Sequence, residues 1–229
     1  MEYIKKLLLS IIPIIKYMVL NYVVIFLGYF IYSLFGNNDM VEYINNYSIY
    51  VVLVFNIIYL FVLIKKYRLH FSKSKNIFEL LLLGISFSLF CNMIILNINS
   101  SKDVVEVNKI ILIISSVIVG PFIEEILFRY ILLGNLKKFN SKIISIILGS
   151  LIFSLMHNGI INILYTFLLG LILGVIYLKK GKITDSIIVH SAANFVSIFL
   201  TGFNNYILLL SFILLVEVVC ILKRSYFKC

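Results

Sequence analysis

Three short motifs place ionisable and amide side chains inside stretches of sequence that are otherwise apolar. Their chemistry-bearing residues are Glu124, Glu125 and Arg129 in the first, Phe153 and His157 in the second, and His190 and Asn194 in the third. A charged group near the centre of a bilayer costs about 2.5–3.5 kcal/mol on insertion scales. Several such groups are costly unless they contact one another, so we predict one buried polar site assembled from three helices.

The first motif gives two neighbouring carboxylates different tasks. Glu125 and Arg129 are four residues apart, so they share a helix face and can form an ion pair. Glu124 points about 100° away on the same helix and needs a partner from another helix. Pro121 lies three residues upstream, where its missing backbone donor could open the helix locally and admit water. An ion pair that serves packing alone is the alternative for Glu125 and Arg129.

The two histidine motifs are weaker signals when each is taken alone. Phe153 with His157, and His190 with Asn194, are again four residues apart. A histidine at a helix end is often structural, and an Asn beside a His can simply hold two helices together. At a rise of 1.5 Å per residue, Glu124, His190 and His157 lie roughly 15, 11 and 22 Å from the cytoplasmic ends of their helices. They can therefore meet if the helices tilt or if a predicted helix boundary is misplaced.

The residue types in these motifs fit hydrolysis by an activated water. A carboxylate can remove a proton from water, and imidazole or amide groups can stabilise the oxyanion that forms. Glu124, His157 and His190 could also hold a zinc ion, since a catalytic zinc keeps three protein ligands and a water. A metal-free mechanism needs the same residues, so no cofactor is firmly implied and a divalent metal such as zinc stays open.

The elements that position these motifs are expected to be transmembrane helices. The chain has 229 residues, of which 62% are hydrophobic and 13% charged, with a mean hydropathy of +1.09. About 20 apolar residues suffice to cross a membrane. We predict an all-α, polytopic transmembrane bundle with about eight spans, at 9–35, 47–64, 77–96, 110–133, 143–157, 159–178, 183–200 and 205–222. The first span is read as uncleaved, with an interfacial turn near Pro13 and Lys16.

The distribution of basic residues predicts the orientation of the spans. Sixteen of the 20 Lys and Arg residues fall at the termini or in alternate loops, and only Lys102 and Lys109 lie in the remaining loops. By the positive-inside rule both termini are cytoplasmic. The net charge of +10 then reflects topology and contact with anionic lipid, and nucleic acid is not an expected partner. We expect a multi-pass protein of the cell membrane, in a bacterium the cytoplasmic membrane.

The order of the three motifs resembles the CAAX-protease and bacteriocin-processing family of intramembrane proteases, also called the Abi family. This family includes the type II CAAX prenyl endopeptidases. The resemblance rests on Glu-Glu-x-x-x-Arg, Phe-x-x-x-His and His-x-x-x-Asn, between about Gly120 and Asn194. We place the protease core at 77–200, after transmembrane helices and a basic loop at 1–76 and before a final helix and basic tail at 201–229.

The resemblance implies a role for each motif residue. Glu124 would activate water with the help of His157, while His190 and Asn194 would stabilise the oxyanion. Glu125, Arg129 and Phe153 would support the site.

The function implied is an endopeptidase that cleaves membrane-associated peptides or proteins, with or without a metal ion. A peptide pheromone, a bacteriocin leader or a CAAX-type protein are the candidate substrates. The alternatives are a non-enzymatic immunity or regulatory protein that uses the polar cluster for packing, and a proton-coupled transporter. A transporter would be expected to show inverted repeats, which we do not find.

Overall fold

The computed structural model describes residues 2–35, 41–98, 108–200 and 204–226, and within these ranges it contains helices and no strands. Seven helices are single elements: α1 (Glu2–Phe35), α2 (Val41–Tyr67), α3 (Ile77–Ile98), α7 (Lys142–Ser154), α8 (Ile160–Lys180), α9 (Ile183–Phe199) and α10 (Asn205–Tyr226). An eighth helical stretch changes its winding along its length, as α4 (Lys109–Ile113), η2 (Ile114–Val119), α5 (Gly120–Glu125), η3 (Ile126–Leu133) and α6 (Gly134–Leu136). The elements η2 and η3 are π-helical.

Each predicted span coincides with one of these eight stretches, so the all-helical fold is confirmed. Five described stretches are long and apolar enough to cross a membrane, and α7, α9 and the apolar part of α10 are shorter. The number of spans and the cytoplasmic position of the termini stay predictions. The expected interfacial turn near Pro13 is wrong, because α1 continues through that residue as one helix.

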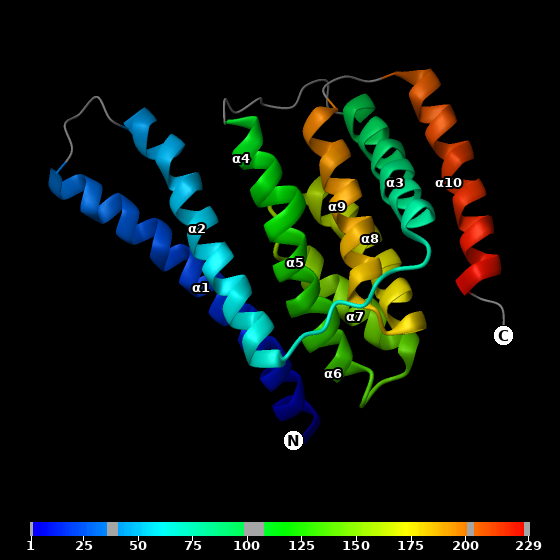
Figure 1. Ribbon diagram of the computed structural model, residues 1–229, viewed down its shortest axis with the longest axis horizontal. Helices are drawn as coiled ribbons and strands as arrows, with labels where there is room; N and C mark the ends of the chain where they lie inside the picture. The colour runs from blue at the N-terminus through cyan, green and yellow to red at the C-terminus, as the bar shows by residue number, and fades with distance from the viewer. Residues whose placement is uncertain (1, 36–40, 99–107, 201–203, 227–229) are drawn as a thin grey trace.

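Figure 1 shows how the helices are arranged around the stretch from α4 to α6. The α1–α2 pair lies on one side of this stretch, while α7, α8, α9 and α3 lie on the other, with α10 at the far edge beyond α3. The buried apolar side chains form two clusters. One is centred on α5 and η3 and reaches α1 and α2, and the second joins α3, α8, α9 and α10.

Small residues allow the helices around the site to approach closely. A Cβ atom added at Gly84 of α3 would lie 2.8 Å from the Cβ of Ala192 on α9. Added at Gly170 or Gly174 of α8, it would lie 3.0 Å from Ser150 or 3.1 Å from Ile146 of α7. The small residues on α9 and the Gly-x-x-x-Gly pattern of α8 therefore act as packing faces, as their sequence indicates.

One helix boundary differs from the prediction, and the difference bears on the site. The span predicted at 143–157 ends as a helix at Ser154, and residues 155–159 form a turn. Gly159 has a φ of 84°, in the left-handed region that favours glycine. His157 thus lies in the turn rather than on the helix. Its backbone N–H donates to the Ser154 carbonyl at 3.0 Å, which keeps it close to the helix end.

Candidate active site

The central helical stretch changes its hydrogen-bond pattern next to the two glutamates. In η2 the N–H of Gly120 donates to the carbonyl of Ser115, five residues earlier. The next residue, Pro121, has no N–H, so the carbonyl of Ser116 has no partner of this type within the helix. The irregularity expected near Pro121 therefore takes the form of a π-helical turn, a feature common at functional sites.

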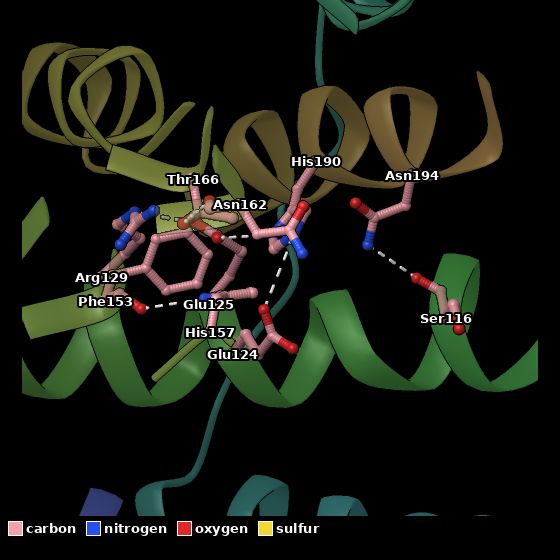
Figure 2. A network of polar contacts seen from close by, with 10 residues as sticks. All are labelled: Ser116, Glu124, Glu125, Arg129, Phe153, His157, Asn162, Thr166, His190 and Asn194. Carbon is pink, nitrogen blue, oxygen red and sulfur yellow. Dashed lines mark hydrogen bonds and ion pairs between the residues drawn. The ribbon is translucent and has the colours of Figure 1, made fainter. Parts of the chain in front are cut away.

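The carbonyl that Pro121 leaves without a helical donor is bound by a motif residue. Asn194 of α9 donates its Nδ2–H to the Ser116 oxygen at 2.8 Å. Figure 2 shows Asn194 pointing toward Ser116, some way along the helix from the two glutamates. An amide group has two N–H donors, so this contact fixes the position of Asn194 while using one of them.

Glu125 and Arg129 form the buried ion pair that their spacing predicts. The Arg129 Nε lies 3.2 Å from the Glu125 Oε2, and both side chains are at most 1% exposed. The alignment is not that of a hydrogen bond, so the contact is mainly electrostatic. The Arg129 guanidinium also lies 4.7 Å from the centre of the Phe153 ring. A buried pair of this kind is costly to break, because either charge alone would be left without its counter-ion.

His190 joins the two glutamates from the opposite side. Its Nδ1 lies 2.9 Å from the Oε1 of Glu125, and its Nε2 lies 3.6 Å from the Oε2 of Glu124. Because Glu125 accepts only, Nδ1 carries the proton in this contact, and Nε2 faces Glu124. The sequence predicts the partner of Arg129 correctly, but it gives no hint that Glu125 also holds His190.

The two glutamates differ sharply in exposure. The side chain of Glu124 is 28% exposed, whereas that of Glu125 is fully buried. This agrees with the prediction that the neighbouring carboxylates have different tasks. Glu125 orients His190 and neutralises Arg129, and Glu124 is the carboxylate that a small molecule can reach.

Phe153 is the packing centre of the site. Its buried ring meets the rings of His157 and His190 edge to face, with centroids 5.0 and 5.8 Å away. The backbone oxygen of Phe153 also lies 3.1 Å from the Nδ1 of His157. Phe153 therefore contacts both histidines, and its supporting role in the site stays a prediction.

A cavity of about 260 Å³ gathers the predicted catalytic residues. Its lining residues are Asn92, Ile95, Glu124, His157, Asn162, Tyr165, Thr166, Leu169, His190, Asn194 and Ser197. All four residues predicted to be catalytic are present, and His157 reaches the cavity despite its greater distance from the end of the molecule that carries the basic loops. Their catalytic roles stay predictions.

Five further polar residues line the cavity and are absent from the sequence prediction, and two of them, Asn162 and Thr166, form a pair on one helix. Asn162 and Thr166 lie four residues apart on α8, and Thr166 donates to the Asn162 carbonyl at 2.6 Å. Asn162 in turn donates to the carbonyl of Asn158, in the turn that carries His157. Two polar residues on one face of an apolar helix are the same signal that identified the other motifs, and it would have found this pair.

The donor atoms near Glu124 are not arranged as a metal site. Among the described residues, no three His, Cys, Asp or Glu side chains lie close enough together to hold a metal ion. The contacts of the Nδ1 atoms of His190 and His157 with Glu125 and the Phe153 backbone do not decide the point, because metal-binding histidines commonly make such contacts through the nitrogen that does not hold the metal. Metal dependence therefore stays a question for experiment.

Comparisons with known proteins agree with the motifs. Residues 106–196 match the family described as type II CAAX prenyl endopeptidase Rce1-like. A protein of Bacillus subtilis (strain 168) named "Putative membrane peptidase YdiL" is 31% identical over 98 residues. That match covers 43% of this chain and 40% of the relative's length. No solved structure matches the chain. The matched region contains all three motifs and lies inside the predicted core at 77–200.

Proposed function

We propose that this protein is an intramembrane endopeptidase, because residues 106–196 match the family described as type II CAAX prenyl endopeptidase Rce1-like. The observation that carries the proposal is the arrangement around His190. One carboxylate, Glu124, lies on the cavity wall and is partly exposed, while its neighbour Glu125 is buried and holds the histidine that faces Glu124. A site for packing alone would not leave a carboxylate exposed to a cavity in the middle of a membrane helix.

In the proposed reaction Glu124 acts as the general base. Its carboxylate accepts a proton from a water in the cavity, and the resulting hydroxide attacks the carbonyl carbon of the scissile peptide bond. His157, on the same cavity wall, would help to hold that water. The tetrahedral intermediate then collapses, and Glu124 returns the proton to the departing amine, so one water is consumed for each bond cut.

Two groups are placed to stabilise the oxyanion of the intermediate. The Nε2 of His190 faces the cavity because Glu125 holds its Nδ1, and a protonated Nε2 can donate. Asn194 offers the second N–H of the amide that is anchored to Ser116. Preorganised donors of this kind contribute about 2.7–4 kcal/mol each to the transition state.

The cavity wall favours a peptide as the bound group. Apart from Ile95 and Leu169, the lining side chains carry polar atoms, which suits the amide groups of an extended backbone. A lipid chain would offer no hydrogen bond to the partly exposed carboxylate of Glu124 or to the second N–H of Asn194, and a buried amide N–H without a partner costs about 1–3 kcal/mol. We therefore propose membrane-associated peptides, such as pheromone or bacteriocin leaders, as substrates. We rank them ahead of a CAAX protein, whose prenyl group would have to lie beside the cavity.

The proposal is tested by peptide cleavage with purified protein in lipid vesicles. Peptides that accumulate in membranes lacking the protein would supply the substrates. We expect Glu124→Gln to reduce the cleavage rate about 10²–10⁴-fold, because it removes the base and keeps the shape. The matched control is Glu217→Gln on α10, an exposed glutamate outside the cavity, which should cleave at the wild-type rate.

If Glu124→Gln cleaves as fast as the wild type, the endopeptidase proposal is wrong. A cellular phenotype that survives Glu124→Gln would point instead to the non-enzymatic immunity or regulatory role.

We also propose that water activation at this site needs no metal ion. The support is that, among the described residues, Glu124, His157 and His190 do not lie close enough together to hold a metal ion. A chelator should leave the cleavage rate of the wild type unchanged. A complete loss of activity that zinc restores would contradict this, and it would assign Glu124, His157 and His190 as ligands.

A further inference from the structure

The cavity extends from the catalytic level toward the end of the molecule that is opposite the basic loops. His190 lies seven residues, about 10 Å, along α9 from the start of that helix at Ile183. Ser197 lies about 21 Å along the same helix, and Asn92 about 22 Å along α3 from Ile77. The helix α8 runs the other way and ends at the basic side with Lys180. Asn162 lies about 27 Å before Lys180, so it too lies far from the basic loops.

Toward the basic loops, in contrast, the site is closed by apolar packing. The turns of η3, α8 and α9 that separate His190 from this end carry side chains that are at most 6% exposed, among them Leu132, Leu133, Leu173, Ile176, Ile183 and Ile187. Buried Glu125, Arg129 and Phe153 form the layer just beneath the cavity.

The loops at the closed end are also tied to each other. Lys180 donates to the side chain of Asn76 at 3.1 Å, and Lys182 donates to the backbone of Lys73 at 3.1 Å. Thr184 donates to the Ser72 carbonyl at 2.7 Å. These bonds link the segment before α3 to the segment between α8 and α9, so both helix ends are fixed where an entrance from the basic side would have to open.

Along the side of the cavity formed by α5, α8 and α9, exposure increases in the same direction, whereas Asn92 on the α3 side is only 4% exposed. His190 is 2% exposed, Glu124 is partly exposed, and Asn162 is exposed. The turn at Asn158 and Gly159, which precedes α8, is exposed as well. The exposed part of the cavity wall therefore lies at Asn162, next to the α7–α8 turn.

We infer that the protein takes its substrate from the extracytoplasmic side of the membrane. By the positive-inside rule the basic loops face the cytoplasm, so the cavity faces outward. The substrate class would be peptides whose cleaved segment lies outside or in the outer half of the bilayer, as in exported peptides and the outer segments of membrane-anchored precursors. The substrate part of this inference rests on the proposed endopeptidase function, whereas the direction of the opening does not.

The direction is tested by the reaction of single cysteines with a thiol reagent that cannot cross membranes. In a background with Cys91→Ala, Cys220→Ser and Cys229→Ser, Asn162→Cys places a thiol at the cavity entrance. We expect it to react in intact cells. The control Lys138→Cys, in the basic segment between α6 and α7, should react only after the membrane is made permeable.

A second single-cysteine variant tests whether the reaction at Asn162→Cys is only a local effect of that substitution. Ile95→Cys lies on α3, on the opposite wall of the same cavity, and should also react from outside. If Asn162→Cys and Ile95→Cys react only from the cytoplasmic side, or only together with Lys138→Cys, the inference is wrong.

The substrate class is tested with two single-span reporter proteins that carry the same cleavable peptide on opposite sides of the membrane. We expect cleavage of the reporter with the extracytoplasmic peptide and no cleavage of its partner. Cleavage of the cytoplasmic peptide alone would overturn the inference. Cleavage of neither would count against the endopeptidase proposal, and the cysteine labelling would still decide the direction of the opening.

Discussion

The α1–α2 pair and the helices around the cavity are similarly apolar but differ in how much of them is buried. In the most apolar windows of α1 and α2, 11% and 6% of the residues are buried inside the protein. The corresponding shares are 50% for α3 and 39% each for the α4–α6 stretch and α8. Hydropathy alone thus identifies helices that cross the membrane, but it does not tell a helix that faces lipid from one that builds a core.

Polar contacts distinguish the two regions more clearly. On α1, Asn21 donates to the carbonyl of Tyr17, four residues earlier on the same helix, at 3.0 Å. Around the cavity, some polar side chains also bond between helices, as Asn194 does to Ser116 and His190 to Glu125. A polar residue satisfied by its own helix needs no neighbour, whereas one bonded across helices fixes how they pack. The comparison indicates that contacts between helices mark the functional site.

The largest difference is expected for the cations of the two regions. Arg129→Gln should destabilise the folded protein by about 3–5 kcal/mol, because it leaves the buried charge of Glu125 without its partner. Lys16→Gln on α1 should leave stability unchanged, since Lys16 is exposed. Thermal unfolding of both variants in detergent measures the effect. Equal melting temperatures for the two variants would show that the ion pair does not stabilise the core.

The amides should differ in activity rather than in stability. Asn194→Ala should lower the cleavage rate about 10²–10³-fold, as expected for loss of one oxyanion donor, while the protein still folds and binds peptide. Asn21→Ala removes an amide that bonds within its own helix and should cleave normally. The rates at saturating peptide test this. A normal rate for Asn194→Ala would limit that residue to holding α9 against η2.

The smallest change in stability is expected for substitutions of the glycines in the two regions. Gly84→Ala should destabilise the protein by about 1–3 kcal/mol, because the new methyl group would press on the backbone of α9 and on Ala192. Gly28→Ala on α1 meets nothing within 4 Å and should be neutral or slightly stabilising. Unfolding curves for the Gly84→Ala and Gly28→Ala variants measure the two changes in stability. A loss of stability at Gly28 would mean that α1 packs on something in the membrane.

Much of the fold can be predicted from the sequence because apolar run length and helix periodicity are local properties. They predict all eight helices, and the spacing of Glu125 and Arg129 predicts their ion pair. That Glu124, His157 and His190 line one cavity is expected from the cost of burying each alone.

The other contacts depend on how helices rotate and end against each other, which no local pattern records. His190 binds Glu125 as well as facing Glu124 because of the rotation of α9. His157 reaches the cavity because α7 stops at Ser154. The pair of Asn162 and Thr166 is different, because its spacing on an apolar helix is a local signal that the sequence does contain.

The two π-helical elements, η2 and η3, lie directly before and after the six residues of α5 that contain both glutamates. A π turn encloses one more residue than an α turn, so each shifts the angular phase of the residues after it by about one residue step, or 100°. The element η2 therefore sets the angular position of both glutamates relative to the helix before them, and η3 does the same for the residues that follow it. A one-residue deletion within Ile114–Val119 would restore ordinary winding there and turn both glutamates away from His190, without changing any residue of the three motifs.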